Sequence, residues 1–140
     1  LEDAAYIYRR DFKPSDALST PKFMLAVNVI AADTDAEAVR LRTSVQQAFA
    51  RLRSGKPGKL PAPVDDIDAE IGPALRRGVD QALRISAVGG PASVQRQLAE
   101  LVAKYQPDEV ILTSQIHDHS ARKRSVSIAA EALGDLAVAA

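Results

Sequence analysis

Cysteine is absent from the 140 residues, which excludes disulfides and thiol chemistry but leaves the cellular compartment open. An excess of charge of one sign is absent too. The 18 Lys and Arg residues balance 18 Asp and Glu residues, so no general field draws the chain to nucleic acid or to a membrane surface. No apolar run approaches the ~18 residues of a membrane span, and the first residues show no signal-peptide pattern. We therefore expect a soluble, cytoplasmic protein without a nucleic-acid or membrane partner.

The chain has about the length of one domain, which is enough for a hydrophobic core. It begins at Leu1 rather than at Met, which predicts that the sequence is a segment of a longer product. Residues 1–21 mix aromatic residues, prolines and charges, and they predict the end of an incoming helix followed by an extended loop.

The stretch from Ser86 to Ser114 predicts a strand, a Gly-Gly-Pro turn, a helix and a second strand. Pro91 suits the first helical turn, because the N–H that proline lacks would have no partner there. Pro107 ends the helix, and the β-branched run from Glu109 to Thr113 is typical of a strand covered on both faces. A strand, a crossover helix and a strand in about 30 residues form a parallel βαβ unit. The fold class is therefore α/β.

Residues 22–32 form a nearly continuous apolar run, which predicts another buried strand. Asn28 interrupts this run, and leaving its amide unpaired would cost about 1–3 kcal/mol. The amide either bonds to neighbouring side chains or water, which we favour, or points into a ligand cavity. Thr34 and Glu37 follow with the spacing of a capping box, and they begin a helix of about five turns that ends near Gly55.

Residues 54–84 predict a long connection between the helix that ends near Gly55 and the strand that begins at Ser86. Five Gly and Pro residues between positions 55 and 63 give a strong loop signal, and Gly72-Pro73 should split the apolar row that follows into two short helices. A long connection in a compact domain is often a lid or an insertion. A poorly ordered linker fits the same composition, and the periodicity leaves both alternatives open.

The last helix is expected from about Ser120. We predict a buried side formed by Val126, Ala129, Ala130, Leu133 and Leu136. The polar loop before this helix contains both histidines of the chain, His117 and His119. Alternate residues of an extended segment point the same way and can share a metal, but a third ligand at motif spacing is missing, and Asp118 suits a helix N-cap. We therefore predict no metal site.

Short motifs occur in one order along almost the whole chain. They are Tyr8-Arg9-x-x-Phe12-x-Pro14-Ser15, Ala32-Asp33-Thr34-Asp35-x-Glu37-Ala38, the segment 58–65, Val88-Gly89-Gly90-Pro91-x-x-Val94, Asp108-Glu109-Val110 and Asp118-His119-x-x-Arg122-x-x-Ser125. In this order and spacing they resemble the C-terminal half of luciferase-like flavin-dependent monooxygenases. The resemblance implies a TIM (β/α)₈ barrel, a fold of ~250 residues. Residues 1–140 would then be a partial barrel domain with roughly strands six to eight and their helices, and residues 54–84 a mobile connection or lid.

The same resemblance implies an activity and partners. The whole enzyme would use O₂ and reduced FMN, supplied by a flavin reductase, to oxidise a small organic substrate, with the deazaflavin F420 as the less favoured cofactor. A homodimer is expected. The N-terminal half of the barrel, which carries most of the flavin contacts, is missing from this sequence, so the fragment alone should be inactive.

The resemblance also indicates where a site would lie, because barrel enzymes place function at the carboxyl ends of the strands. Asn28, Thr113 and Gln115 would line the substrate or flavin cavity. Gly89 and Gly90 lead into a helix N-terminus and could bind the cofactor through backbone N–H groups, although tight packing of the turn is favoured. No catalytic residue is identified.

Two further polar groups could serve a flavin enzyme. His119 could act as an acid–base group near the flavin, but a capping or surface role is favoured for it. The basic run 122–124 could contact a phosphate, but a solvated helix face is favoured for this run. As an alternative function, the chain is a non-catalytic α/β remnant that acts as a dimerisation or assembly module, with its open strand edges paired to a second copy.

Overall fold

The computed structural model describes the backbone of residues 1–138 and the side chains of residues 1–134. In chain order, the elements of this part are α1 (Glu2–Asp11), β1 (Met24–Ala31), α2 (Asp35–Arg53), α3 (Ile67–Ile71), α4 (Pro73–Ala82), β2 (Ser86–Gly89), α5 (Pro91–Tyr105), β3 (Glu109–Thr113) and α6 (His119–Val138). Their positions agree with the sequence predictions to within a few residues. The expected capping contact is confirmed, since Thr34 Oγ1 accepts the N–H of Glu37 at 3.2 Å.

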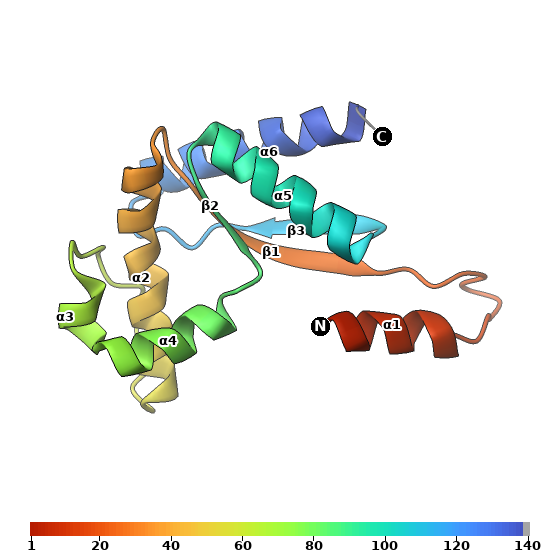
Figure 1. Cartoon of the computed structure of the whole chain (residues 1–140), viewed down its shortest axis with the longest axis horizontal. Coiled ribbons are helices and arrows are strands. Elements are labelled where there is room, and N and C mark those ends of the chain that lie inside the picture. The colour runs from red at the N-terminus through yellow and green to blue at the C-terminus, as the bar shows by residue number, and fades with distance from the viewer. Residues whose placement is uncertain (139–140) are drawn as a thin grey trace.

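The three strands form one parallel sheet in the order β2-β1-β3 (Figure 1). Residues 28–31 of β1 pair with β2, and residues 24–28 pair with β3 on the other edge. The parallel βαβ unit β2-α5-β3 is present, but β1 lies between its two strands. Consecutive strands of a (β/α)₈ barrel are neighbours, so this order differs from an uninterrupted run of strands six to eight. The sequence could not predict the order, because ladder hydrogen bonds are made by backbone groups common to all residues.

One face of the sheet is covered by α5 and α6 and carries the larger core (Figure 1). Alternate residues of β1 point into it, as the period of two requires. They pack against Val94 and Leu98 of α5, both with no exposed surface, and against Ile128 of α6. Burying one side chain of this size contributes about 1.5–3 kcal/mol.

The buried side of α6 differs from the predicted one. Val126 is 52 % exposed and Ala130 is exposed, whereas Ser125, Ile128, Ala129 and Ala132 are buried. Ala129 is thus predicted correctly, Leu133 is half-buried, and Leu136 lies outside the described side chains. The helix is rotated toward Ser125 because the hydroxyl of this residue bonds to the backbone of β1, a contact that a hydrophobic pattern does not include.

The opposite face of the sheet is covered only at its carboxyl end. There Ile30 of β1 and Val88 of β2 pack against α2 and α4. The remaining residues of this face form what we call the open face. They are Met24, Ala26 and Asn28 of β1, Ser86 of β2, and Glu109, Ile111 and Thr113 of β3.

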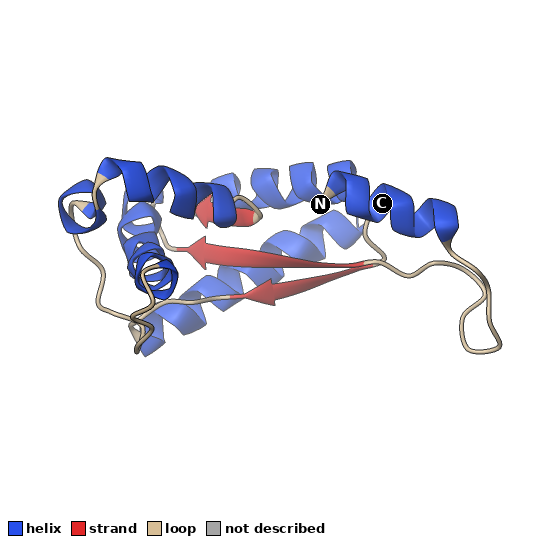
Figure 2. Cartoon of the chain, turned by 90° about the horizontal axis from the view of Figure 1, so that it is seen from below, coloured by secondary structure: helices blue, strands red, loops and turns tan. Residues whose placement is uncertain are grey.

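The open face has no cover among the described residues. Met24 is 57 % and Ile111 is 47 % exposed, and in Figure 2 no helix lies in front of β1 and β3. The prediction that residues 109–113 are covered on both faces is therefore wrong for this chain. Its Val110 and Leu112 are half-buried under the helices, and the residues between them are exposed.

Candidate functional site

The open face ends in a polar pair at the carboxyl end of β3. Asn28 and Thr113 are register partners, and Thr113 Oγ1 donates a hydrogen bond to Asn28 Oδ1 at 2.6 Å. Neither Nδ2 hydrogen of Asn28 has a partner within the described part of the chain. The structure thus brings together two of the three predicted cavity residues. Gln115 is exposed in the segment between β3 and α6.

The turn before α5 holds a carboxylate of the chain itself. Asp35 Oδ1 accepts the N–H of Gly90 at 2.6 Å, and Asp35 Oδ2 accepts the hydroxyl of Ser93 at 3.1 Å. These two bonds, the backbone bond above all, lower the pKa of the Asp35 carboxyl. A cofactor phosphate that used the N–H of Gly90 would have to displace Asp35.

Gly89 is required by the close approach of Asp35. Its φ is +146°, and a Cβ atom there would lie 2.5 Å from Asp35 Oδ1 and 2.7 Å from Ser93 Cβ. This is the packing role that the sequence favours for the turn. A cofactor contact at Gly89 and Gly90 stays a prediction.

The histidine-containing loop caps α6. Asp118 Oδ1 accepts the N–H of Ala121 at 2.8 Å, which is the predicted N-cap contact. His119 Nδ1 lies 2.8 Å from an Arg122 guanidinium nitrogen. Within residues 1–134, no group of three His, Cys, Asp or Glu side chains is placed to hold a metal ion.

The basic run on α6 contributes one ion pair at the carboxyl end of the sheet. Arg124 donates from Nε and from a terminal nitrogen to Asp33 Oδ1, at 3.0 and 2.8 Å. This carboxylate raises the pKa of the Arg124 guanidinium. Both side chains are more than half exposed, so the pair adds little stability.

A buried serine joins α6 to the carboxyl end of β1. Pairing of β1 with β3 stops at Asn28, so the N–H of Ala31 has no strand partner on that edge. Ser125 Oγ accepts this N–H at 2.9 Å and itself receives the hydroxyl of Ser114 at 3.0 Å. Ser125 has no exposed surface. Sequence reasoning missed this contact, although Ser125 closes one of the motifs that carry the family resemblance.

From Ala62 onward, the connection 54–84 is bound to α2 by polar side chains, of which Thr43, Gln46 and Gln47 are buried. Gln47 Nε2 donates to the carbonyl oxygen of Ala62 at 2.9 Å, and Thr43 Oγ1 accepts the N–H of Val64 at 2.8 Å. Farther along, Asp80 of α4 accepts bonds from Gln46 and from arginines of α2 and α4. These contacts place the segment beside α2; its movement as a lid stays a prediction.

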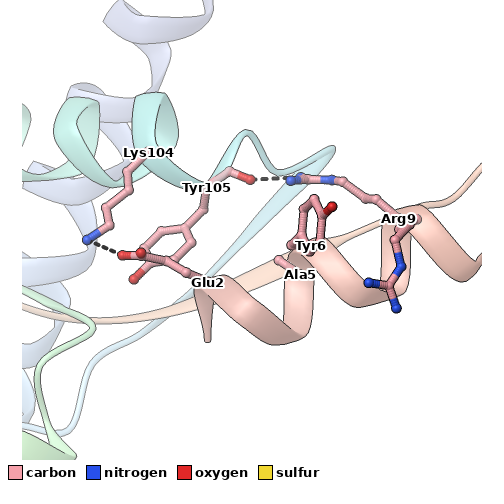
Figure 3. A pocket seen from close by; sticks show the side chains of 7 residues that line it. Glu2, Ala5, Tyr6, Arg9, Lys104 and Tyr105 are labelled. Carbon is pink, nitrogen blue, oxygen red and sulfur yellow. Dashed lines mark hydrogen bonds and ion pairs between the residues drawn. The ribbon is translucent and has the colours of Figure 1, made fainter.

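A groove of about 570 Å³ lies between α1 and the C-terminal end of α5 (Figure 3). Arg9 of α1 donates to the carbonyl oxygens of Tyr105 and Gln106 at 2.7 and 2.6 Å, where a cation complements the helix dipole. Lys104 pairs with Glu2 and lowers the pKa of that carboxyl. Because α5 ends where β3 begins, the groove lies at the amino ends of the strands, the side that serves stability in barrel proteins.

Comparisons with known proteins cover nearly the whole chain. No family model matches it. It is 40 % identical over 136 residues to the luciferase-like monooxygenase of Escherichia coli K12, and the match covers 97 % of this chain and 41 % of that protein. It is 39 % identical over 128 residues to the uncharacterized protein YvbT of Bacillus subtilis 168, covering 91 % of this chain and 38 % of YvbT. The crystal structure of apo-MsnO8 superposes with a TM-score of 0.75 at 29 % identity, over 95 % of this chain and 41 % of that one.

The fold is that of a partial α/β domain. It has a parallel sheet with two helices on one face and an open second face. The chain spans about two fifths of the length of the curated relatives it matches. It fits a C-terminal fragment of a protein of the luciferase-like monooxygenase class. Among the described helices, none is both long and apolar enough to cross a membrane.

Proposed function

We propose that this chain is the C-terminal part of a flavin-dependent monooxygenase, which oxidises a small organic substrate with O₂ and reduced FMN. The observation that carries the proposal is the open face. Parallel sheets are normally buried on both faces, and the luciferase-like relative is more than twice as long as this chain. The remaining residues of the longer protein would pair with the free edges of β2 and β3 and close a barrel whose interior the open face lines.

The carboxyl end of the open face fits a ligand site. There the Asn28–Thr113 pair offers hydrogen-bonding groups to a flavin or a substrate, and Met24, Ala26 and Ile111 offer apolar side chains to the barrel interior below it. When bound, reduced FMN supplies the electrons that activate O₂. The part of this chain is to orient the ring and the substrate and to exclude water from one side of the cavity.

The proposal extends to partners and location. A separate flavin reductase supplies reduced FMN, FMN is preferred to F420, the enzyme is a homodimer, and it works in the cytoplasm. Gly89 and Gly90 approach the cofactor only if Asp35 gives up its bond to Gly90. Gln115 lines the mouth of the substrate cavity from the loop after β3.

Denaturing mass spectrometry of the native gene product, followed by FMN titration, tests the proposal. We expect a single chain or a fragment pair well above 15.0 kDa, and quenching of flavin fluorescence that saturates on addition of the protein. A lone species of 15.0 kDa that dimerises and leaves flavin fluorescence unchanged would instead support the assembly module.

Limited proteolysis tests the lid. Cleavage between residues 54 and 66 should slow when FMN saturates the protein, because a segment that closes over a bound ligand opens less often. Unchanged cleavage at saturating FMN would count against the lid and leave flavin binding itself standing.

A further inference from the structure

We infer that a strand from the part of the longer protein outside this chain pairs with the amino-terminal half of β1, at Met24 and Ala26, and ends where β2 begins. The inference rests on the proposed function and narrows its account of barrel closure, because it places the incoming strand beside β1, in line with β2, and not on the outer edge of β2. Gln97 of α5 closes that outer edge.

Hydrogen bonds show which edge each residue of β1 faces. The N–H of Asn28 donates to the carbonyl oxygen of Ile85 at 3.2 Å, on the side of β2. In a strand, the N–H and C=O groups of one residue point to one edge and those of the next residue to the other. Met24 and Ala26 therefore present their backbone groups to the same side as Asn28.

The strand β2 is too short to meet these groups. Its pairing with β1 begins at Asn28 and covers residues 28–31, so β2 flanks only the carboxyl-terminal half of β1 (Figure 2). Among the described residues, no hydrogen bond reaches the backbone of Met24 or Ala26 from this side. Both residues thus have free N–H and C=O groups in a strand whose other edge is paired with β3 along residues 24–28. A row of unpaired backbone groups is a template for another strand.

The outer edge of β2 is closed by a side chain. Gln97 Oε1 accepts the N–H of Val88 at 3.1 Å, and Gln97 Nε2 donates to the carbonyl oxygen of the same residue at 2.8 Å. The carboxamide thus takes both backbone groups of Val88 that a further strand would use. Of the four residues of β2, only Ser86 also faces outward, since Gly89 and every second residue before it face β1. A new strand cannot pair with β2 unless Gln97 leaves.

The space in line with β2 has an apolar floor of the kind that a strand covers. A groove of about 350 Å³ is lined by Ile85, directly before β2, and by Leu101 of α5. Both side chains are half-buried and pack against the larger core. Alternate side chains of an incoming strand would cover them and complete this core. The luciferase-like relative of Escherichia coli has more than half of its length outside the part that this chain matches, which is enough to supply the strand.

Amide hydrogen exchange in the native full-length protein, read residue by residue, tests the inference. The N–H groups of Met24 and Ala26 should exchange at least about a hundredfold more slowly than in the unfolded chain, as slowly as those residues of β1 that face β3. Gln97→Leu should speed exchange at Val88 at least about tenfold and leave Met24 and Ala26 protected, because only Val88 loses its acceptor. Glu100→Gln, an exposed change on the same helix, is the control and should leave all three rates within about twofold.

The outcomes separate the inference from the function on which it rests. If the native protein binds FMN but Met24 and Ala26 exchange at the rate of the unfolded chain, only the inference is overturned. It is also overturned if Val88 stays protected in Gln97→Leu, since its N–H would then have a strand partner on the outer edge of β2. If the native gene product is a lone chain of 15.0 kDa, the proposed function fails and the inference fails with it. Protection at Met24 and Ala26 that is lost on dilution would then assign this edge to a second copy of the chain.

Discussion

Removing the Ser125 hydroxyl should destabilise the fold, because it leaves a buried backbone N–H of β1 without an acceptor. In the Ser125→Ala variant, the N–H of Ala31 loses its acceptor at 2.9 Å, and neither residue has surface exposed to water. An unsatisfied buried donor costs about 1–3 kcal/mol. Ser114, whose hydroxyl also bonds to Ser125, is half-buried and can turn to water, so it adds little.

Urea unfolding measures the effect. With a slope m of about 2 kcal/mol/M, a loss of about 2 kcal/mol lowers the midpoint by roughly 1 M and leaves m unchanged. Ser127→Ala is the matched control on the same helix: its exposed hydroxyl bonds only to the carbonyl oxygen of Lys123 at 3.2 Å, so we expect a change within about 0.5 kcal/mol. Equal midpoints for the two variants would refute the idea that Ser125 completes the edge of β1.

Three further predictions concern the turn before α5 and the core beneath it. Gly89→Ala should cost about 1–3 kcal/mol or more, because its φ of +146° strains a side chain and the new Cβ meets Asp35 at 2.5 Å. Gly58→Ala, with open space around it, is the control and should be nearly neutral in the same urea unfolding experiment. The bond from Gly90 lowers the pKa of Asp35, so its stabilisation is complete above the ordinary aspartate value of 3.8 and is lost as the pH falls through the lowered value. The stability difference between wild type and Asp35→Asn should therefore shrink below pH 3.8, and a constant difference would contradict it. Leu98→Ala, at a site with no exposed surface, should lose about 2–5 kcal/mol, and a loss under 1 kcal/mol would show that this contact is not in the core.

Local features of the fold were predictable because they depend on neighbouring residues. Thr34 caps α2, Asp118 caps α6, and Gly72-Pro73 divides α3 from α4, each within four positions of the residues that signal it. The two acidic groups at positions 33 and 35 look alike in sequence. Only the structure shows that Asp35 accepts the N–H of Gly90, 55 residues farther along, at the start of α5.

Long-range features were not predictable from periodicity. The order β2-β1-β3 depends on which backbone edges meet. The attachment of residues 62–64 depends on Thr43 and Gln47, polar residues that a hydrophobic pattern assigns to solvent although they are 4 % and 3 % exposed. For the candidate site, the pattern identified Asn28 as an exception within an apolar strand, but its contact with Thr113 required the register of two strands 85 residues apart.

Oxidation of Met24 tests the central claim, that the rest of a longer protein covers the open face. Met24 is the single methionine of this chain and lies on that face, 57 % exposed. Hydrogen peroxide converts exposed methionine to its sulfoxide, which adds one oxygen to the peptide that contains it and is measured by mass spectrometry. In the native full-length protein, we predict that Met24 is oxidised at least about tenfold more slowly than in the same protein unfolded in urea. A rate in the native protein equal to that in the unfolded one would mean that the open face stays in water, and it would contradict the barrel and the flavin site built on it.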